Sequence, residues 1–144
     1  KSAMPAATPA FIQGDAMNLP FADASFDVVS IAWGIRNVAE PSKALREFRR
    51  VLRPGGRLIV VEFSEPGNRV MRAMNRLYTA KIMPCTATLI ARDRSGAYRY
   101  LPRSVEDFPQ PEAFATLIEQ AGFLRPMMHP LTFGVCTIYL ARLH

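Results

Sequence analysis

The sequence predicts an α/β domain built around a parallel sheet. Two apolar runs carry this prediction: residues 26–33, FDVVSIAW, and residues 57–63, RLIVVEF. Both runs are apolar on their two alternating faces, which is typical of strands covered by helices on each side. A segment with helical spacing and short joins connects them, so strand, helix and strand form a right-handed parallel crossover.

The length and composition of the chain limit the classes of protein to which it can belong. The chain has 144 residues, of which 49% are hydrophobic and 21% charged, as in one globular domain with one core. No apolar run approaches the roughly 20 residues that a membrane-spanning helix needs. We therefore expect a soluble, cytoplasmic protein.

The chain is basic, with a formal net charge of +6 and a pI near 9.9. Such a charge permits binding to nucleic acid or to an anionic membrane surface. The arginines are scattered, however, and no recognised nucleic-acid motif accompanies them, so we expect no nucleic-acid partner. Cys85 and Cys136 lie far apart, and His129 and His144 have no partner at metal-ligand spacing. This predicts a reducing compartment and no metal site.

The first half of the chain supplies the elements around the two runs. Residues 11–15 are a short apolar approach to Gly-Asp, which predicts a brief strand that ends in the turn-rich loop MNLPFADASFD, residues 17–27. A helix begins at Pro41. Its apolar residues recur at helical spacing: Leu45, Phe48, Val51 and Leu52. Residues 53–56, RPGG, end this helix before the second run.

Three further segments follow the second run. Residues 67–94 carry an apolar, methionine-rich stripe at helical spacing, which packs in the core or a lid, or alternatively faces a membrane. Residues 110–121 predict another amphipathic helix, which Gly122 ends. The tail, residues 131–143, predicts one or two closing strands.

Polar residues stand where the first buried run ends. The stretch GIRNVAEP, residues 34–41, places Arg36 and Asn37 just beyond that strand. Ligands of open α/β sheets bind beyond the carboxyl ends of the strands, so both are candidate site residues, with a solvated loop as the alternative. Asp15 follows the preceding predicted strand in the same way, although an Asx-capped turn also explains it.

These motifs resemble a known enzyme family. The stretch GDAMNLPFADASFDVV, residues 14–29, is similar to the GDA, LPF and SFD pattern of S-adenosylmethionine-dependent class I methyltransferases. GIRNV, ALREFRRVLRPGGRLIVVEFSEP, YRYLPRSVEDFP and AGF narrow the resemblance to the C-methyltransferases of ubiquinone and menaquinone biosynthesis, which include demethylmenaquinone methyltransferases. The resemblance extends from about Phe11 to Leu140.

The resemblance implies a Rossmann-like class I methyltransferase sheet with the strand order 3-2-1-4-5-7-6 and an antiparallel last strand. Residues 11–15 then correspond to strand 3, residues 26–33 to strand 4, residues 57–63 to strand 5, and the tail to strands 6 and 7. Strands 1 and 2 are lacking, together with the glycine-rich loop that holds the cofactor's methionine part. We expect residues 1–144 to be the C-terminal part of a single methyltransferase domain, inactive alone if that loop is indispensable.

Without strand 1, residues 26–33 would form an exposed apolar edge, which is prone to pairing with other chains. We therefore expect this edge to be covered by the rest of a longer enzyme or by a second copy, in a homodimer or swapped oligomer.

The resemblance also implies the chemistry: transfer of a methyl group from S-adenosylmethionine to a ring carbon of a prenylated benzoquinol or naphthoquinol. Arg36 would stabilise the developing phenolate, because a guanidinium stays charged at any working pH. Asn37 would hydrogen-bond a second ring oxygen. A loop salt bridge and a helix-entry cap are the respective structural alternatives.

Other positions match the family's binding residues. Asp15 and Ala16 would border the cofactor's adenine, and Ala32 would contact the cofactor through its backbone. Trp33, Tyr98 and Tyr100 would line the substrate side, with a core tryptophan and a packed loop as the structural alternatives. Residues 70–83 would accept the isoprenoid tail and touch the inner face of the membrane.

Two other functions fit the sequence. One is a methyltransferase of the same fold that acts on another lipophilic acceptor. The other is a non-catalytic module, in which the remaining sheet serves as a partner-binding or dimerisation surface.

Overall fold

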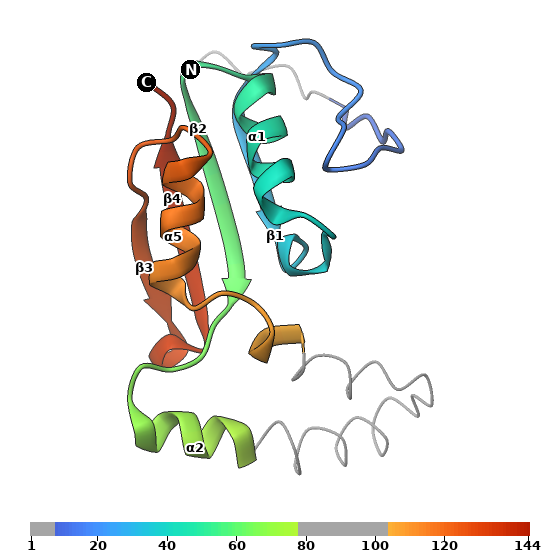
Figure 1. The fold of residues 1–144 in the computed structure, drawn as a ribbon. Coiled ribbons are helices and arrows are strands. Elements are labelled where there is room, and N and C mark those ends of the chain that lie inside the picture. The colour runs from blue at the N-terminus through green and yellow to red at the C-terminus, as the bar shows by residue number, and fades with distance from the viewer. Residues whose placement is uncertain (1–7, 78–103) are drawn as a thin grey trace, which may run out of the picture.

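The computed structural model of the chain describes residues 8–77 and 104–144 (Figure 1). Its elements follow in this order: β1 (Phe26–Ala32), η1 (Ile35–Asn37), α1 (Pro41–Val51), β2 (Leu52–Phe63), α2 (Arg69–Leu77), α5 (Pro111–Gln120), β3 (Met127–Leu131), η3 (Thr132–Gly134) and β4 (Cys136–Arg142). The strand predicted at residues 26–33, the helix from Pro41, the strand at residues 57–63 and the helix after residue 110 are confirmed. β2 begins at Leu52, however, so the RPGG segment lies within this strand and does not separate it from the helix. The predicted tail, residues 131–143, contains β4, whereas β3 begins ahead of it at Met127.

The four strands of the described residues form one mixed sheet in the order β1-β2-β4-β3. β1 runs parallel to β2, with Ile31 opposite Val60. β4 is antiparallel to both of its neighbours, β2 and β3. The order agrees with 4-5-7-6, which the resemblance implies for this part of the sheet, and the last strand of the chain lies inside the sheet.

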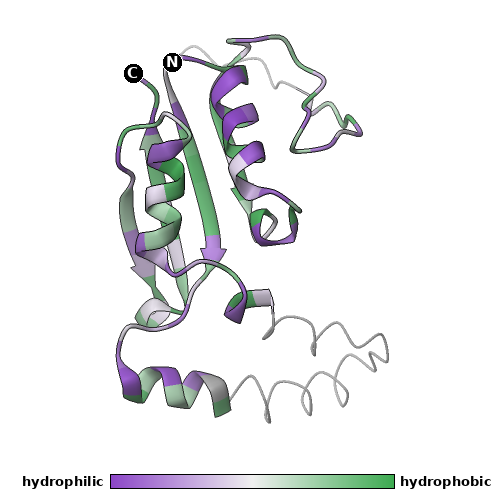
Figure 2. Ribbon diagram, in the orientation of Figure 1, coloured by the Kyte–Doolittle hydropathy of each residue, from purple (hydrophilic) through white to green (hydrophobic). Residues whose placement is uncertain are grey.

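Helix α1 joins β1 to β2 and has one apolar side. Pro41 stands in its first turn, where a missing backbone N–H costs nothing. Its buried residues recur at helical spacing: Ala44, Leu45, Phe48 and Val51. Arg46 and Arg49 remain exposed on the outward side, and Figure 2 shows that polar side of the helix. The amphipathic pattern therefore fixes which face of α1 meets the sheet.

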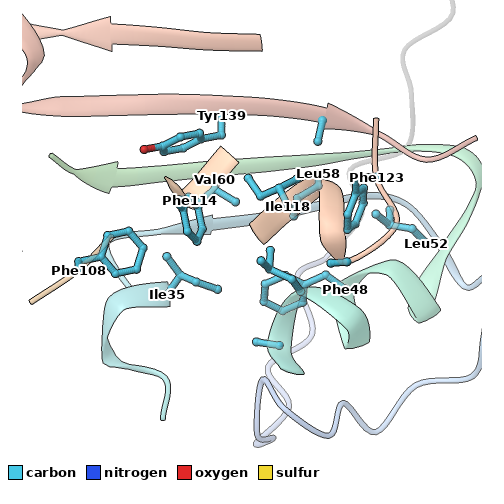
Figure 3. Close-up of a cluster of buried hydrophobic side chains, with 14 residues drawn as sticks. Ile35, Phe48, Leu52, Leu58, Val60, Phe108, Phe114, Ile118, Phe123 and Tyr139 are labelled. Atoms are coloured by element: carbon cyan, nitrogen blue, oxygen red, sulfur yellow. The ribbon is translucent and has the colours of Figure 1, made fainter. Parts of the chain in front are cut away.

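The core lies between the sheet and the helices α1 and α5, which cover the same face (Figures 1 and 3). Leu58 and Val60 of β2 and Tyr139 of β4 point into it. Phe114 of α5 meets Tyr139 edge to face, with ring centroids 5.0 Å apart. This packing holds β1 and β2 in place and thereby fixes where their carboxyl ends lie.

The opposite face of the sheet is not covered by a described helix or strand. Val28 in β1 is 40% exposed and Met127 in β3 is 62% exposed. The prediction that both apolar runs are covered on each side is therefore wrong for the described part of the chain, because α1 and α5 both lie on one side of the sheet.

The strand predicted at residues 11–15 is also wrong. Phe11 is 97% exposed, and the one β-bridge there joins Asp15 to Asn18 within a turn. A strand needs a neighbour for its N–H and C=O groups. Among the described strands, β1 pairs only with β2, so residues 11–15 have no strand beside them.

None of the described helices combines the length and the apolar character that crossing a bilayer requires.

Candidate functional site

The backbone turns sharply where β1 ends. Trp33 still donates its N–H to the Val61 carbonyl oxygen, at 2.8 Å, but its φ of 51° lies in the left-handed region that side chains other than glycine seldom adopt. The chain then passes through Gly34 into the short helix η1. This turn places the residues of the GIRN stretch beyond the carboxyl end of β1, as the sequence predicts.

Arg36 points inward from η1 to the end of β2. Its Nη1 atom forms an ion pair with Glu62 Oε1 at 2.6 Å, and the two side chains are 9% and 0% exposed. Nη1 also donates to the Trp33 carbonyl oxygen at 2.7 Å, and Nε donates to Ser104 Oγ at 3.3 Å. The guanidinium is therefore held rigidly by three groups from separate parts of the chain.

Glu62 is a site residue that the sequence analysis missed. Besides the guanidinium, its carboxylate accepts hydrogen bonds from the backbone N–H groups of Arg36, at 3.4 Å, and Phe63, at 2.9 Å. The signal in the sequence was an acidic residue inside the apolar run RLIVVEF. A carboxylate in a buried strand needs a paired charge, which Arg36 supplies.

Aromatic rings flank this ion pair. The Arg36 guanidinium carbon lies 5.2 Å from the centre of the Phe63 ring, within the range of a cation–π contact. The Trp33 ring lies 6.1 Å from the Phe63 ring, measured between centroids, and Trp33 is 51% exposed. Trp33 is thus not a core tryptophan, and its ring is available at the surface beside Arg36.

Asn37 and Ala32 also lie at this end of the sheet. Asn37 ends η1 and is exposed, with its N–H donated to the Gly34 carbonyl oxygen at 3.0 Å. Ala32 is the last residue of β1, is exposed and pairs with Val61. The structure therefore brings four of the predicted residues together: Ala32, Trp33, Arg36 and Asn37.

Asp15 and Ala16 belong to a separate loop. Asp15 Oδ1 accepts a hydrogen bond from the N–H of Met17 at 2.9 Å, which is an Asx turn. Leu19 then donates its N–H to Glu47 Oε2 of α1 at 3.0 Å. The described hydrogen bonds of Asp15 stay within its own turn and do not reach the Arg36 group.

Tyr98 and Tyr100 lie outside the described residues. Their predicted role at the substrate entrance therefore stays a prediction.

Two titratable groups near the site have raised pKa values. Burial and the Glu62 carboxylate raise the pKa of the Cys136 thiol. Burial raises the pKa of the Tyr139 hydroxyl well above its ordinary range. Both groups are consequently neutral near pH 7, so neither offers a thiolate or a phenolate as a nucleophile. The arrangement suits charge stabilisation by a fixed cation rather than attack by a protein nucleophile.

Known proteins resemble this chain over most of its length. A sequence model described as the ubiE/COQ5 methyltransferase family matches residues 4–142. A ubiquinone/menaquinone biosynthesis C-methyltransferase from Hahella chejuensis is 45% identical over 129 residues, which cover 90% of this chain and 51% of that protein. A demethylmenaquinone methyltransferase from Thermus thermophilus is 47% identical over 130 residues, which cover 90% of this chain and 58% of that protein. The chain thus spans about half the length of these relatives.

Solved structures confirm the fold class. A SAM-dependent methyltransferase from Thermotoga maritima superposes with a TM-score of 0.61 at 20% identity, covering 92% of this chain and 63% of that one. A second SAM-dependent methyltransferase, from Aquifex aeolicus, superposes with a TM-score of 0.56 at 15% identity. The match covers 94% of this chain and 55% of that one. The described sheet is therefore part of a Rossmann-like class I methyltransferase fold. With the family match across nearly all of its residues, the chain belongs to the ubiE/COQ5 methyltransferase family.

Proposed function

We propose that this chain is the carboxyl-terminal part of an S-adenosylmethionine-dependent methyltransferase that methylates a ring carbon of a prenylated benzoquinol or naphthoquinol. The observation that carries the proposal is the family match over residues 4–142. The relatives named for ubiquinone and menaquinone biosynthesis cover 90% of the chain. These names favour quinols over other lipophilic acceptors and over a non-catalytic module.

The residues present fit the adenine end of the cofactor. Asp15 is exposed and uses Oδ1 to cap Met17, which leaves its carboxylate accessible to an amino group. Ala16 is partly buried and packs against the core, so the backbone beside Asp15 is anchored. Ala32 offers an exposed backbone at the carboxyl end of β1. S-adenosylmethionine, when bound, supplies an electrophilic methyl group on its sulfonium.

Arg36 acts in this proposal as a fixed hydrogen-bond donor to the phenolate oxygen of the substrate. Its Nη1 and Nε atoms are occupied by Glu62, Trp33 and Ser104, whereas Nη2 takes no part in the hydrogen bonds of the described residues. Glu62 orients the guanidinium and balances part of its charge. Positioning of this kind reduces the barrier because the donor need not reorganise during the reaction.

Asn37 and Trp33 complete the proposed substrate side. Asn37 is exposed one residue after Arg36 and offers an amide to the second ring oxygen. The half-exposed Trp33 ring offers an apolar wall for the aromatic ring. Tyr98 and Tyr100 are proposed for the entrance from the family motif alone.

Helix α2 is proposed as the contact with the inner face of the membrane or with the isoprenoid tail. Its exposed apolar residues recur at helical spacing: Val70, Met74 and Leu77. The exposed Arg69 on the same helix would attract anionic lipid, whereas Arg72 pairs with Glu65 at 3.6 Å. Co-sedimentation with phosphatidylglycerol vesicles should therefore occur at low salt and decrease with salt. Met74→Glu should weaken it, and equal binding of the variant would contradict this contact.

The function is tested by a chimera in which this chain replaces the matching half of the Thermus thermophilus relative. The chimera should methylate demethylmenaquinone, and Arg36→Lys should lower turnover more than cofactor affinity. A folded chimera that binds S-adenosylhomocysteine but leaves demethylmenaquinone and demethylated benzoquinols unmethylated would refute the proposal. Unchanged turnover in the Arg36→Lys chimera would remove only Arg36 from the mechanism.

Cofactor binding by the chain alone is tested separately by calorimetric titration with S-adenosylhomocysteine. Saturable binding that Asp15→Ala abolishes would show that the adenine half-site is formed by these residues. Unaltered binding in that variant would remove Asp15 from the site.

Association through β1 is the remaining part of the proposal. Its outer edge has no strand beside it among the described residues, so it offers unpaired N–H and C=O groups to a second copy or to further polypeptide.

A further inference from the structure

Two charged residues of α1 bind the loop that precedes β1. Glu47 and Arg50 stand three positions apart on the helix. Two hydrogen bonds join them, from Arg50 Nε to Glu47 Oε1 and from Arg50 Nη2 to Glu47 Oε2, both at 2.9 Å. A pair of this spacing usually adds little to the stability of a helix. Here both side chains also reach residues 19–23 of the loop, which indicates a role beyond the helix itself.

Leu19 is held by both of its backbone groups. Its N–H donates to Glu47 Oε2 at 3.0 Å, and its carbonyl oxygen accepts from Arg50 Nη2 at 3.0 Å. Arg50 Nη1 also donates to the Phe21 carbonyl oxygen at 2.8 Å and to Asp23 Oδ1 at 2.7 Å. The guanidinium thus joins three loop residues, and its two-point contact with Glu47 fixes the direction of its donors.

The loop has no regular secondary structure of its own. Residues 14–25 belong to no helix or strand, and Figure 1 shows this loop beside α1. Ala16, Met17 and Leu19 pack against the core, but apolar contact is not directional. The hydrogen bonds to Glu47 and Arg50 are directional, so they determine which part of the loop lies against the firmly packed helix.

The turn that carries Asp15 directly precedes Leu19. Asn18 donates its N–H to the Asp15 carbonyl oxygen at 2.9 Å, which closes the turn. A Cβ atom at Gly14 would lie 3.1 Å from Pro20 Cδ, so the start of the turn packs on the residue that follows Leu19. A displacement of Leu19 would therefore move both ends of the turn and, with them, Asp15.

We propose that Glu47 and Arg50 are positioning residues for the cofactor: by holding Leu19 they keep Asp15 and Ala16 in place for the adenine. The inference rests on the proposed function, in which Asp15 and Ala16 border that ring. A loop that is already ordered loses less conformational freedom when the ligand binds, which increases affinity. The described hydrogen bonds of Arg50 do not include Asp15, so the effect passes through the loop backbone.

Limited proteolysis of the 144-residue chain tests whether Arg50 holds the loop. Chymotrypsin cleaves after Phe21, whose carbonyl oxygen Arg50 binds, and after Phe11, which is 97% exposed and serves as an internal reference. Arg50→Gln should increase the rate at Phe21 relative to Phe11 about tenfold, because hydrogen bonds to a charged group are lost and cleavage follows the population of the open loop. Arg46→Gln is the matched control: it removes the same charge from an exposed position of α1 and should leave the ratio unchanged.

A double-mutant cycle in the chimera with the Thermus thermophilus relative tests the effect on the cofactor. Arg50→Gln should raise the Kd for S-adenosylhomocysteine about tenfold by calorimetry. The same change should raise it clearly less in the Asp15→Ala background, where the positioned contact is already gone. The KM for S-adenosylmethionine should rise more than kcat falls. Arg50→Lys, which keeps the charge without the fork of donors, should recover part of the affinity.

The outcomes separate this inference from the function on which it rests. An unchanged cleavage ratio, an equal increase in Arg46→Gln, or the same loss of affinity with and without Asp15 would each overturn the positioning role, and so would a variant that melts earlier but binds S-adenosylhomocysteine as the parent does. Unaltered binding in Asp15→Ala would overturn the adenine contact and the positioning role with it. A chimera that shows the expected titrations but methylates no quinol would refute the proposed acceptor and still support the positioning role.

Discussion

Arg36 and Glu62 lie 26 residues apart in the sequence, yet their side chains meet at 2.6 Å in the interior. One belongs to the turn after β1 and the other to the last part of β2, so the pair ties the carboxyl ends of the two parallel strands together. The family motifs GIRNV and EFSEP thus describe one contact from its two sides.

Removing one member of this pair should destabilise the fold strongly. In Arg36→Ala the Glu62 carboxylate stays buried without a paired charge and keeps only the backbone N–H donors of residues 36 and 63, and the loss of a buried ion-pair partner costs about 3–5 kcal/mol. The measurement is the free energy of unfolding from urea denaturation. Arg53→Ala is the control, because the Arg53–Asp27 pair is exposed and should contribute no more than about 1 kcal/mol. Similar decreases in the free energy of unfolding of the two variants would mean that the buried pair stabilises the fold no more than the exposed pair does.

Gly122 should resist substitution where Gly67 does not. Gly122 has a φ of 96°, and a Cβ atom there would lie 2.6 Å from Nε of Arg49. Gly122→Ala should therefore raise strain at the end of α5 and cost about 1 kcal/mol or more. Gly67 has open space around its Cβ position, so Gly67→Ala should be neutral or slightly stabilising. Thermal unfolding of the two variants distinguishes these outcomes, and equal melting temperatures would contradict the strain at Gly122.

The Glu47–Arg50 pair should make stability fall in acid. The hydrogen bond from Arg50 lowers the pKa of Glu47 below its ordinary value of 4.5. The folded state therefore favours the ionised carboxylate of Glu47. The stability that this carboxylate adds is fully present above pH 4.5, and it is lost as the pH falls through the lowered pKa of the folded state. Glu47→Gln should flatten the decrease in urea midpoint below pH 4.5 without altering its course above pH 6. If the urea midpoint of Glu47→Gln decreased below pH 4.5 as steeply as that of the parent, this contribution of Glu47 would be refuted.

The outer edge of β1 should make the chain associate at high concentration. Val28→Lys places a charge beside this edge, which opposes the approach of another strand. Light scattering after gel filtration should show a lower average mass for this variant than for the parent. Phe133→Lys is the control, because Phe133 is an exposed apolar residue away from β1. A parent chain that remains monomeric throughout would exclude association through this edge.

The sequence predicted the elements whose pattern is local. The helix from Pro41 and the run at residues 57–63 follow from periodicity, and the strand order followed from the family resemblance. The strand at residues 11–15 was predicted wrongly, because its apolar pattern was followed although the resemblance already implied that its partner, strand 2, is lacking.

The candidate site was predicted in part. Arg36 and Asn37 were found because polar residues follow a buried strand. Glu62 was missed because its importance depends on a partner that only the fold brings near. Asp15 was placed by motif alone, and its Asx turn leaves its role to be tested.

The interior position of β4 has a consequence for the biosynthesis of the chain. Ser64 at the end of β2 and Thr137 in β4 are hydrogen-bonded across a separation of 73 residues. Until residues 136–142 have left the ribosome, β2 has only β1 beside it among the described strands, and Leu58 and Val60 lack the cover of Tyr139 and Ala141. The described sheet is therefore completed only after β4 has been synthesised. A premature stop before residue 136 would remove a central strand and disconnect β3 from the rest of the sheet.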